Sequence, residues 1–132
     1  MKADEINIRD PFILVENQAY YMYGTRGETA WSNGKGFDVY KSNDLVEWEG
    51  PVQVFDSAAY GLDRGVNWAP EVHKYKNGYY MFATFLQENG HIGTYILYSG
   101  TPEGPDVYKR QGLYLGKRNG CIKKEQRRRI GL

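Results

Sequence analysis

Cysteine, histidine and long apolar runs are scarce in this sequence, and each scarcity excludes a class of protein. The 132 residues include one cysteine and two histidines without ligand-like spacing, so neither an internal disulfide nor a zinc site is expected. No apolar run approaches the ~20 residues of a membrane-spanning helix. Neither a phosphate-binding glycine loop nor a nucleophilic Ser or Cys elbow is present. We therefore expect no cofactor, no metal ligands and no membrane partner.

The net charge of +1 hides two parts of opposite sign. Residues 1–105 hold eight Lys and Arg against fourteen Asp and Glu, a net charge of −6. Residues 106–132 hold nine against two, a net charge of +7. The acidic body lacks the basic face that nucleic-acid binding requires, so no nucleic-acid partner is expected. The segment Met1–Glu5 lacks the apolar run of a signal peptide, which favours a cytoplasmic location.

Aromatic residues and glycine, in contrast, are abundant. The chain holds twelve Tyr, five Phe, three Trp and sixteen Gly. Tyr and Trp suit half-buried sheets, and Gly suits tight turns, so this composition predicts an all-β fold. Trp48 begins an outer strand and is interpreted as structural. Trp31 lies in the loop from Gly24 to Gly36, near an expected pocket rim, and is assigned no role.

An internal repeat organises the chain. Residues 10–13, Asp-Pro-Phe-Ile, recur 59 positions later as residues 69–72, Ala-Pro-Glu-Val. The other segments matched at this offset are residues 20–23 with 79–82 and Thr25 with Thr84.

Each repeat is predicted to form four short strands. Four-stranded repeats of roughly 40–50 residues are typical of propeller blades, and one blade cannot bury both of its faces alone. Asn77-Gly78, between two β-rich runs, predicts a hairpin. The expected strands are Phe12–Val15, Ala19–Tyr23, Phe37–Tyr40 and Trp48–Val54 in the first repeat, and Val72–Tyr75, Tyr79–Thr84 and Thr94–Tyr98 in the second, with a fourth due after Pro105.

We divide the chain into blade 1 at residues 6–56, an incomplete blade 2 at residues 57–105 and a basic tail at residues 106–132. The repeat pattern stops where this tail begins, and a charged run follows at residues 123–129. Residues 106–111 also resemble translated adaptor sequence. The tail is therefore expected to be non-native or disordered. The alternative is a natural basic tail that binds acidic partners.

Four motifs follow one another at blade spacing: residues 8–13, residues 20–25, residues 42–51, and residues 67–74 followed by 77–80. Together they resemble the opening of glycoside hydrolase family 43, over about residues 6–105. The resemblance implies the first two blades of a five-bladed β-propeller, truncated before the ring closes. It also implies a carbohydrate substrate and hydrolysis of O-glycosyl bonds in xylan or arabinan side chains or oligosaccharides, with arabinofuranosides and xylosides as substrate types.

Asp10 is the candidate catalytic residue. It precedes Pro11, and the residue before a proline is held extended, which predicts a fixed heading for the carboxylate. The first strand of a propeller blade lines the central channel, so Asp10 is expected at the bottom of a pocket. In the resembled family this aspartate is the general base for inversion, which needs a second, protonated carboxyl group ~6.5–9.5 Å away. Without the resemblance, Asp10 is read instead as a turn cap or a partner of Arg9.

Trp68 and Glu71 are the candidate substrate-binding residues. An indole beside a channel-facing carboxylate can stack on a sugar ring, but packing between blades explains Trp68 equally well. Glu71 is taken to occupy the equivalent of the Asp10 position in the second repeat and to point toward the channel. It is expected either to contact sugar hydroxyls or to act as a structural hydrogen-bond acceptor. It is not assigned as the general acid, which lies in a later blade of the resembled family.

The leading hypothesis is a glycosidase in which this chain supplies the base but lacks the general acid and a second aspartate that tunes its pKa. The chain alone is therefore expected to be inactive. A non-catalytic carbohydrate-binding β-module is the alternative from a different class. Related propellers that act by phosphorolysis are a weaker third option, which would need basic phosphate ligands in later blades.

Overall fold

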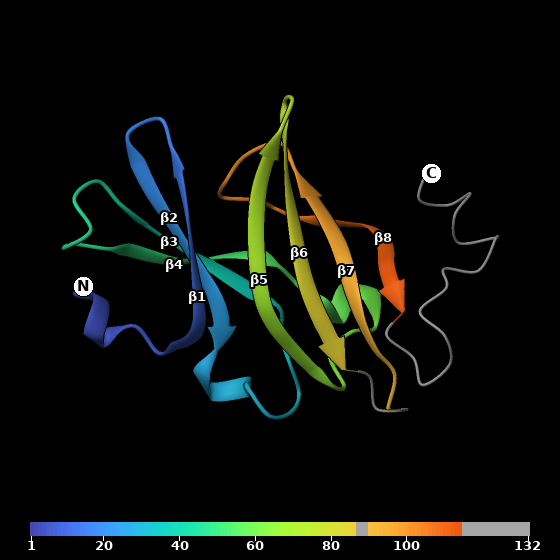
Figure 1. Ribbon diagram of the computed structural model, residues 1–132. Helices are drawn as coiled ribbons and strands as arrows, with labels where there is room; N and C mark the ends of the chain where they lie inside the picture. Colours follow the sequence, from blue (N-terminus) through green and yellow to red (C-terminus); the bar gives the residue numbers. More distant parts are fainter. Residues whose placement is uncertain (87–89, 115–132) are drawn as a thin grey trace.

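Two four-stranded antiparallel sheets make up the fold in the computed structural model, which describes residues 1–86 and 90–114 (Figure 1). In each sheet every strand pairs with the next along the chain, the meander order of a propeller blade. Blade 1 consists of β1 (Ile8–Glu16), β2 (Ala19–Arg26), β3 (Phe37–Ser42) and β4 (Glu49–Phe55). Blade 2 consists of β5 (Val66–Tyr75), β6 (Gly78–Leu86), β7 (Ile92–Ser99) and β8 (Val107–Tyr114).

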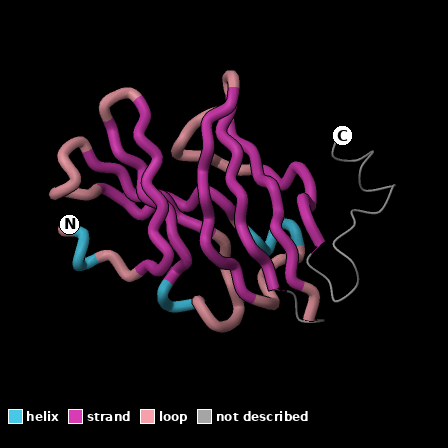
Figure 2. The backbone as a smooth tube through the Cα atoms, viewed as in Figure 1, coloured by secondary structure: helices cyan, strands magenta, loops and turns pink. Residues whose placement is uncertain are grey.

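The strand-rich architecture confirms the predicted all-β fold (Figure 2). Helical structure in the described residues is limited to three short 3₁₀ turns, η1 (Ala3–Glu5), η2 (Gly27–Thr29) and η3 (Ser57–Tyr60). None of these described turns has the length and apolar character needed to cross a bilayer.

The tight turns of the first hairpins explain how each blade begins. Asn17 and Gln18 connect β1 to β2, and both have positive φ, as a two-residue hairpin turn requires. In blade 2 the turn lies one residue earlier than Asn77-Gly78 predicts, because Gly78 already pairs with Tyr75. Gly78 is needed for packing instead, since a Cβ there would overlap the Tyr98 ring.

An aromatic core joins the two blades. Phe37 of β3, Phe55 of β4 and Phe85 of β6 are at most 1% exposed. The Phe85 ring meets each of the two blade 1 rings edge-on, with centroids 5.9 Å apart. This is the range in which aromatic pairs attract each other beyond simple burial. The blades are therefore held together by apolar contact that neither sheet could supply alone.

The loop between β7 and β8 adds a polar connection across the same interface. The Tyr23 hydroxyl, on β2, donates to the Pro102 carbonyl at 2.5 Å, and the Asp106 amide donates to the Val54 carbonyl at 2.5 Å. Burial raises the pKa of Tyr23 and, separately, raises the pKa of Asp106 to about 7. Both groups therefore favour the uncharged form where the loop packs on blade 1.

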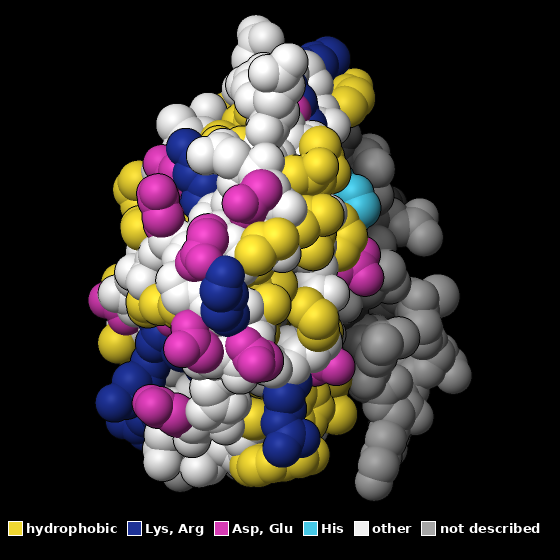
Figure 3. Space-filling view, turned by 90° about the vertical axis from the view of Figure 1, so that its left-hand side faces the viewer, with side chains coloured by type: hydrophobic (Ala, Val, Ile, Leu, Met, Phe, Trp, Pro, Cys, Tyr) yellow, Lys and Arg dark blue, Asp and Glu magenta, His cyan; other side chains and the backbone are white. Residues whose placement is uncertain are grey.

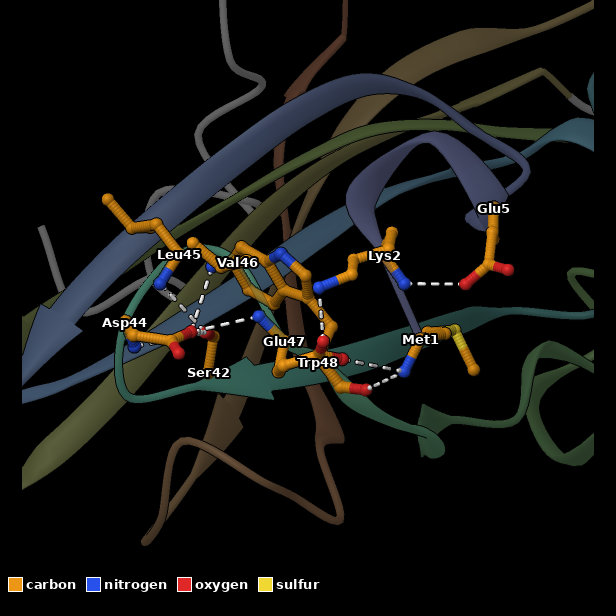
Figure 4. A network of polar contacts seen from close by, with 9 residues as sticks. All are labelled: Met1, Lys2, Glu5, Ser42, Asp44, Leu45, Val46, Glu47 and Trp48. Atoms are coloured by element: carbon orange, nitrogen blue, oxygen red, sulfur yellow. Dashed lines mark hydrogen bonds and ion pairs between the residues drawn. The ribbon is translucent and has the colours of Figure 1, made fainter.

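The N-terminus packs against the outer part of blade 1 (Figure 4). Met1 and Trp48 exchange two backbone bonds: the Met1 ammonium donates to the Trp48 carbonyl at 2.9 Å, and the Trp48 amide returns a bond at 2.8 Å. Lys2 pairs with Glu47 at the surface. Asp44 accepts the amides of Glu47 and of the residue before it, which lowers the pKa of the Asp44 carboxyl. Together these contacts of the N-terminus and of the segment around Asp44 cover Trp48 on the outer side of blade 1.

Blade 2 extends beyond the boundary expected at residue 105. β8 pairs antiparallel with β7, so residues 107–114 belong to the second sheet and not to a separate tail. Both fourth strands follow the same tripeptide: Glu-Gly-Pro opens β4 at residues 49–51 and lies just before β8 at residues 103–105. The prediction for the rest of the tail, residues 115–132, lies outside the described residues.

Replacing Phe85 with Ala is expected to lower the free energy of unfolding by about 3 to 5 kcal/mol, because it leaves a cavity between the blades. Phe82→Ala is the matched control on the same strand, since Phe82 is 38% exposed. Urea titration followed by tyrosine and tryptophan fluorescence measures both. Equal losses for the two variants would contradict the aromatic core as the joint between blades.

Asp106→Asn is expected to become more stable relative to the wild-type chain as pH rises. The pKa of Asp106 is raised in the folded state to about 7, so folding favours the protonated form. This contribution is fully present below the unfolded pKa of about 4 and is lost as pH rises through about 7. Thermal melts between pH 4 and pH 8 measure the trend, with Asp4→Asn as an exposed control. A stability difference that does not change with pH would refute the role of Asp106.

Candidate active site

A pocket of about 400 Å³ lies between the two blades. Its walls come from β1 and β2 of blade 1, from the segment after η2, and from β5 and β6 of blade 2. The lining residues are Arg9, Asp10, Thr25, Ala30, Trp31, Trp68, Ala69 and Thr84. The structure thus brings two of the three candidate residues, Asp10 and Trp68, into one cavity.

Asp10 sits in a β-bulge and not in regular extended backbone. The pairing of β1 with β2 shifts register between Arg9 and Phe12, and Asp10 has φ of 50°. The expectation that the proline would hold Asp10 extended is therefore wrong. The proline rule excludes the right-handed helical region, whereas the bulge places the residue in the left-handed region, which Asp tolerates better than most residues. Such strained positions are typical of functional sites.

Blade 2 repeats the same backbone irregularity at Ala69. The register of β5 and β6 shifts between Trp68 and Glu71, and Ala69 has φ of 47°. Ala69 is therefore the structural equivalent of Asp10, in agreement with the 59-residue offset of the repeat. A methyl group here replaces the carboxylate, so blade 2 supplies no second acid or base at this position.

A buried threonine connects the two bulges. The Ala69 amide donates to Thr25 Oγ1 at 2.8 Å, and Thr25 Oγ1 lies 3.2 Å from Asp10 Oδ2, to which it donates. Thr25 is 1% exposed. The carboxylate of blade 1 is thereby held by a hydroxyl that is itself oriented by the backbone of blade 2.

Trp68 both packs between the blades and lines the pocket. Its indole Nε1 donates to the Ala30 carbonyl at 2.6 Å, which fixes the loop after η2 against blade 2. The same half-buried side chain lines the pocket. Its ring meets Trp31 edge-on, with centroids 6.5 Å apart. Packing between blades and a surface available to a sugar ring are therefore compatible at this residue.

Trp31 and Arg9 form an exposed edge of the pocket that the sequence does not assign. Trp31 is 74% exposed, and the Arg9 guanidinium lies 5.3 Å from the centroid of its ring. A loop with many glycines gives no periodic pattern, so the position of Trp31 follows only from tertiary contacts. Exposure of a large aromatic ring at a pocket is the kind of surface that carbohydrate recognition uses.

Asn67 is a second residue whose role the sequence does not show. It is 3% exposed, accepts the Gly36 amide at 2.8 Å and donates to the Leu62 carbonyl at 2.9 Å. Its side chain also lies directly against Gly34, where a Cβ would clash. Asn67 therefore ties the glycine-rich loop to β5 and, through that loop, sets the position of Trp31.

Glu71 lies apart from the pocket lining. Its side chain is 61% exposed and its Oε2 is 3.4 Å from His73 Nε2. In the repeat it corresponds to Phe12, and Ala69 takes the position of Asp10. Among the described residues that line the pocket, Asp10 is thus the one carboxylate.

Charged side chains of both signs are mixed on the surface of blade 1. On the face of blade 1 shown in Figure 3, Asp and Glu lie between apolar and basic side chains, without a continuous basic patch. Within residues 1–86 and 90–114, no cluster of three or more His, Cys, Asp or Glu could hold a metal ion. The chemistry of the described pocket rests on one carboxylate, hydroxyl groups, aromatic rings and a guanidinium.

Comparison with known proteins points to glycoside hydrolases. The sequence model of glycosyl hydrolases family 43 matches residues 5–115. The extracellular exo-α-(1→5)-L-arabinofuranosidase ArbA of Cellvibrio japonicus (strain Ueda107) is 24% identical in an alignment of 123 residues that covers 86% of this chain and 33% of that protein. The chain thus spans about a third of the length of this curated relative.

Solved structures resemble the fold over most of the chain. A thermostable family-43 glycoside hydrolase is 33% identical, with a TM-score of 0.66, over 77% of this chain and 32% of that one. The endo-arabinase of Bacteroides thetaiotaomicron VPI-5482 is 30% identical, with a TM-score of 0.69, over 89% of this chain and 44% of that one. The two sheets therefore correspond to two blades of a larger propeller.

Replacing Trp68 with Phe is expected to loosen the loop after η2, because the ring remains but the indole bond to the Ala30 carbonyl is lost. Amide hydrogen exchange across residues 27–36 should speed up by about fivefold, which corresponds to the ~1 kcal/mol of one hydrogen bond. Trp31→Phe is the control, since Trp31 is exposed. Unchanged exchange in Trp68→Phe would show that the loop is held without this bond.

Proposed function

Because this chain belongs to family 43 of the glycosyl hydrolases, we propose that it forms part of an inverting glycosidase in which Asp10 is the general base. The bonds cleaved are O-glycosyl bonds in plant polysaccharide side chains or the oligosaccharides derived from them. The observation that carries the proposal is the position of Asp10, the one carboxylate of the described pocket lining, on a strained bulge between two aromatic-lined blades.

Arabinofuranosides are the favoured substrates, with xylosides as the second type. Two relatives support arabinan as the polymer: the Cellvibrio japonicus protein is named an exo-α-(1→5)-L-arabinofuranosidase and the Bacteroides thetaiotaomicron structure an endo-arabinase. One acts on chain ends and the other within the chain, so the mode of attack is left out of the proposal.

An inverting mechanism requires two carboxyl groups on opposite sides of the scissile bond. They stand ~6.5–9.5 Å apart, which leaves room for the attacking water. Asp10 supplies the base, and Ala69 shows that blade 2 carries no acid at the equivalent bulge. The general acid is therefore proposed to come from a segment outside the described residues. It follows that residues 1–114 by themselves have no significant hydrolytic activity.

Trp68 and Glu71 are the proposed sugar contacts. Trp68 is supported by its place in the pocket lining beside Trp31. Glu71 has weaker support, because its exposed carboxylate lies next to His73 and outside the lining. A contact from Glu71 would require a sugar unit that extends beyond the pocket.

A carbohydrate-binding role without catalysis is the second candidate for the chain alone. The exposed Trp31 ring and the Trp68 ring favour it, because they offer aromatic surface with no acid–base pair. Calorimetric titration of the 132-residue chain with arabino-oligosaccharides tests this candidate. Binding that survives Asp10→Asn but is lost in Trp68→Ala is the expected result for a binding module.

Asp10→Asn in the complete protein is expected to lower kcat on aryl arabinofuranosides by at least about 1,000-fold, since the amide cannot accept the water proton. Circular dichroism should show an unchanged fold. Asp4→Asn, at the exposed N-terminal turn, is the matched control and keeps the wild-type rate. Near-normal activity of Asp10→Asn would remove Asp10 from the mechanism.

A further inference from the structure

We propose that Thr25 is the positioning residue for Asp10 and that it relays the docking of blade 2 to the catalytic carboxylate. The relay consists of the Ala69 amide, Thr25 Oγ1 and Asp10 Oδ2, with donor–acceptor distances of 2.8 and 3.2 Å. This inference rests on the proposed function, because it assigns a role relative to Asp10 as base.

The direction of each bond in the relay follows from the groups involved. A backbone amide can only donate, so Thr25 Oγ1 uses a lone pair to accept from Ala69. Its single proton is then free for the one carboxylate within reach, Asp10 Oδ2. A hydrogen bond from a hydroxyl to an ionised carboxylate is stronger than one between neutral groups. Thr25 therefore holds the carboxylate of Asp10 in one orientation.

The relay also makes the two oxygens of Asp10 unequal. Oδ2 is occupied by the Thr25 hydroxyl, so Oδ1 is the oxygen assigned to the attacking water. In the chemical step the water oxygen bonds to the anomeric carbon while its proton passes to Oδ1. The glycosidic bond breaks with its electron pair going to the leaving oxygen, which takes a proton from the general acid. Because Oδ2 is fixed, Oδ1 points in one direction. A reacting water must be aligned in this way to attack the anomeric carbon.

The equivalent threonine of blade 2 helps to distinguish a positioning role of Thr25 from simple packing. Thr84 is the counterpart of Thr25. Thr25 pairs with Arg9 and Thr84 pairs with Trp68, in each case next to the bulge of the first strand. Both threonines line the pocket. Only Thr25 stands beside an aspartate, because Ala69 replaces that residue in blade 2. Both blades thus carry a threonine at this place, but only Thr25 has an aspartate to position.

Thr25→Val in the complete protein tests the relay, because valine fills the same space and cannot form either bond. We expect kcat on an aryl arabinofuranoside to fall by about 10- to 100-fold, the range for losing a hydrogen bond to a charged group, with KM within about twofold. Thr25→Ser should restore the rate, because serine keeps the hydroxyl that accepts from Ala69 and donates to Asp10.

Thr94→Val is the control for the substitution itself, since Thr94 lies on β7 outside the pocket lining. Its kinetic constants should match those of the wild-type protein. If Thr25→Val does not fold, Thr25→Cys replaces it, because a thiol is a weak donor of similar size. A reduced rate with an intact fold is then expected.

The outcomes distinguish the relay from the general base. In Asp10→Asn, adding Thr25→Val should cause no further loss, because the two residues act as a unit. If Asp10→Asn is inactive while Thr25→Val has wild-type kcat and KM, the relay is refuted and the general base stands. If Asp10→Asn itself is active, the proposed function fails. A Thr25→Val loss confined to stability, with kcat and KM unchanged, also overturns the relay, as does a Thr25→Ser variant that is as slow as Thr25→Val.

Discussion

The packing of blade 1 on blade 2 is the contact on which the rest of this structure depends. A single four-stranded sheet cannot bury both faces, and here the shared face is filled by Phe37, Phe55 and Phe85. The pocket is built from residues of both blades, so it exists only while the blades are docked. Stability and the candidate active site are therefore consequences of the same apolar interface.

The bulge that both blades share brings polar groups to the pocket at this interface. Both blades interrupt the first strand at a proline and place the preceding residue at positive φ. In blade 1 that residue is Asp10, and in blade 2 it is Ala69. One position therefore carries a carboxylate, and the other donates its backbone amide. Thr25 bonds to both of them.

The strands and the repeat could be predicted from the sequence because they follow from local patterns. The aromatic run at Ala19–Tyr23 and its counterpart 59 residues later lie within β2 and β6 as expected. Asp10 was identified through the family motif, and the structure places it in a pocket. Its left-handed backbone could not be foreseen, since a bulge arises from the register between strands and not from the residue alone.

Three other features depend on tertiary contacts, on the alignment of the repeat or on backbone pairing. Trp31 reaches the pocket because Asn67 and Trp68 hold its loop. Glu71 misses the pocket because it is the counterpart of Phe12, and the 59-residue offset already makes Ala69 the counterpart of Asp10. β8 confirms the fourth strand predicted after Pro105, and only the assignment of its residues to the tail is wrong, because pairing with β7 uses backbone groups and does not need the side-chain pattern of the repeat.

Azide rescue of Asp10→Ala in the complete protein is a direct test of Asp10 as the general base. Azide attacks without needing a base, so it should restore cleavage of an activated aryl arabinofuranoside in a variant that is otherwise nearly inactive. We expect a glycosyl azide of inverted anomeric configuration, observable by proton NMR. Asp10→Ala with undiminished hydrolysis, or a glycosyl azide of retained configuration, would contradict Asp10 as the general base of an inverting glycosidase.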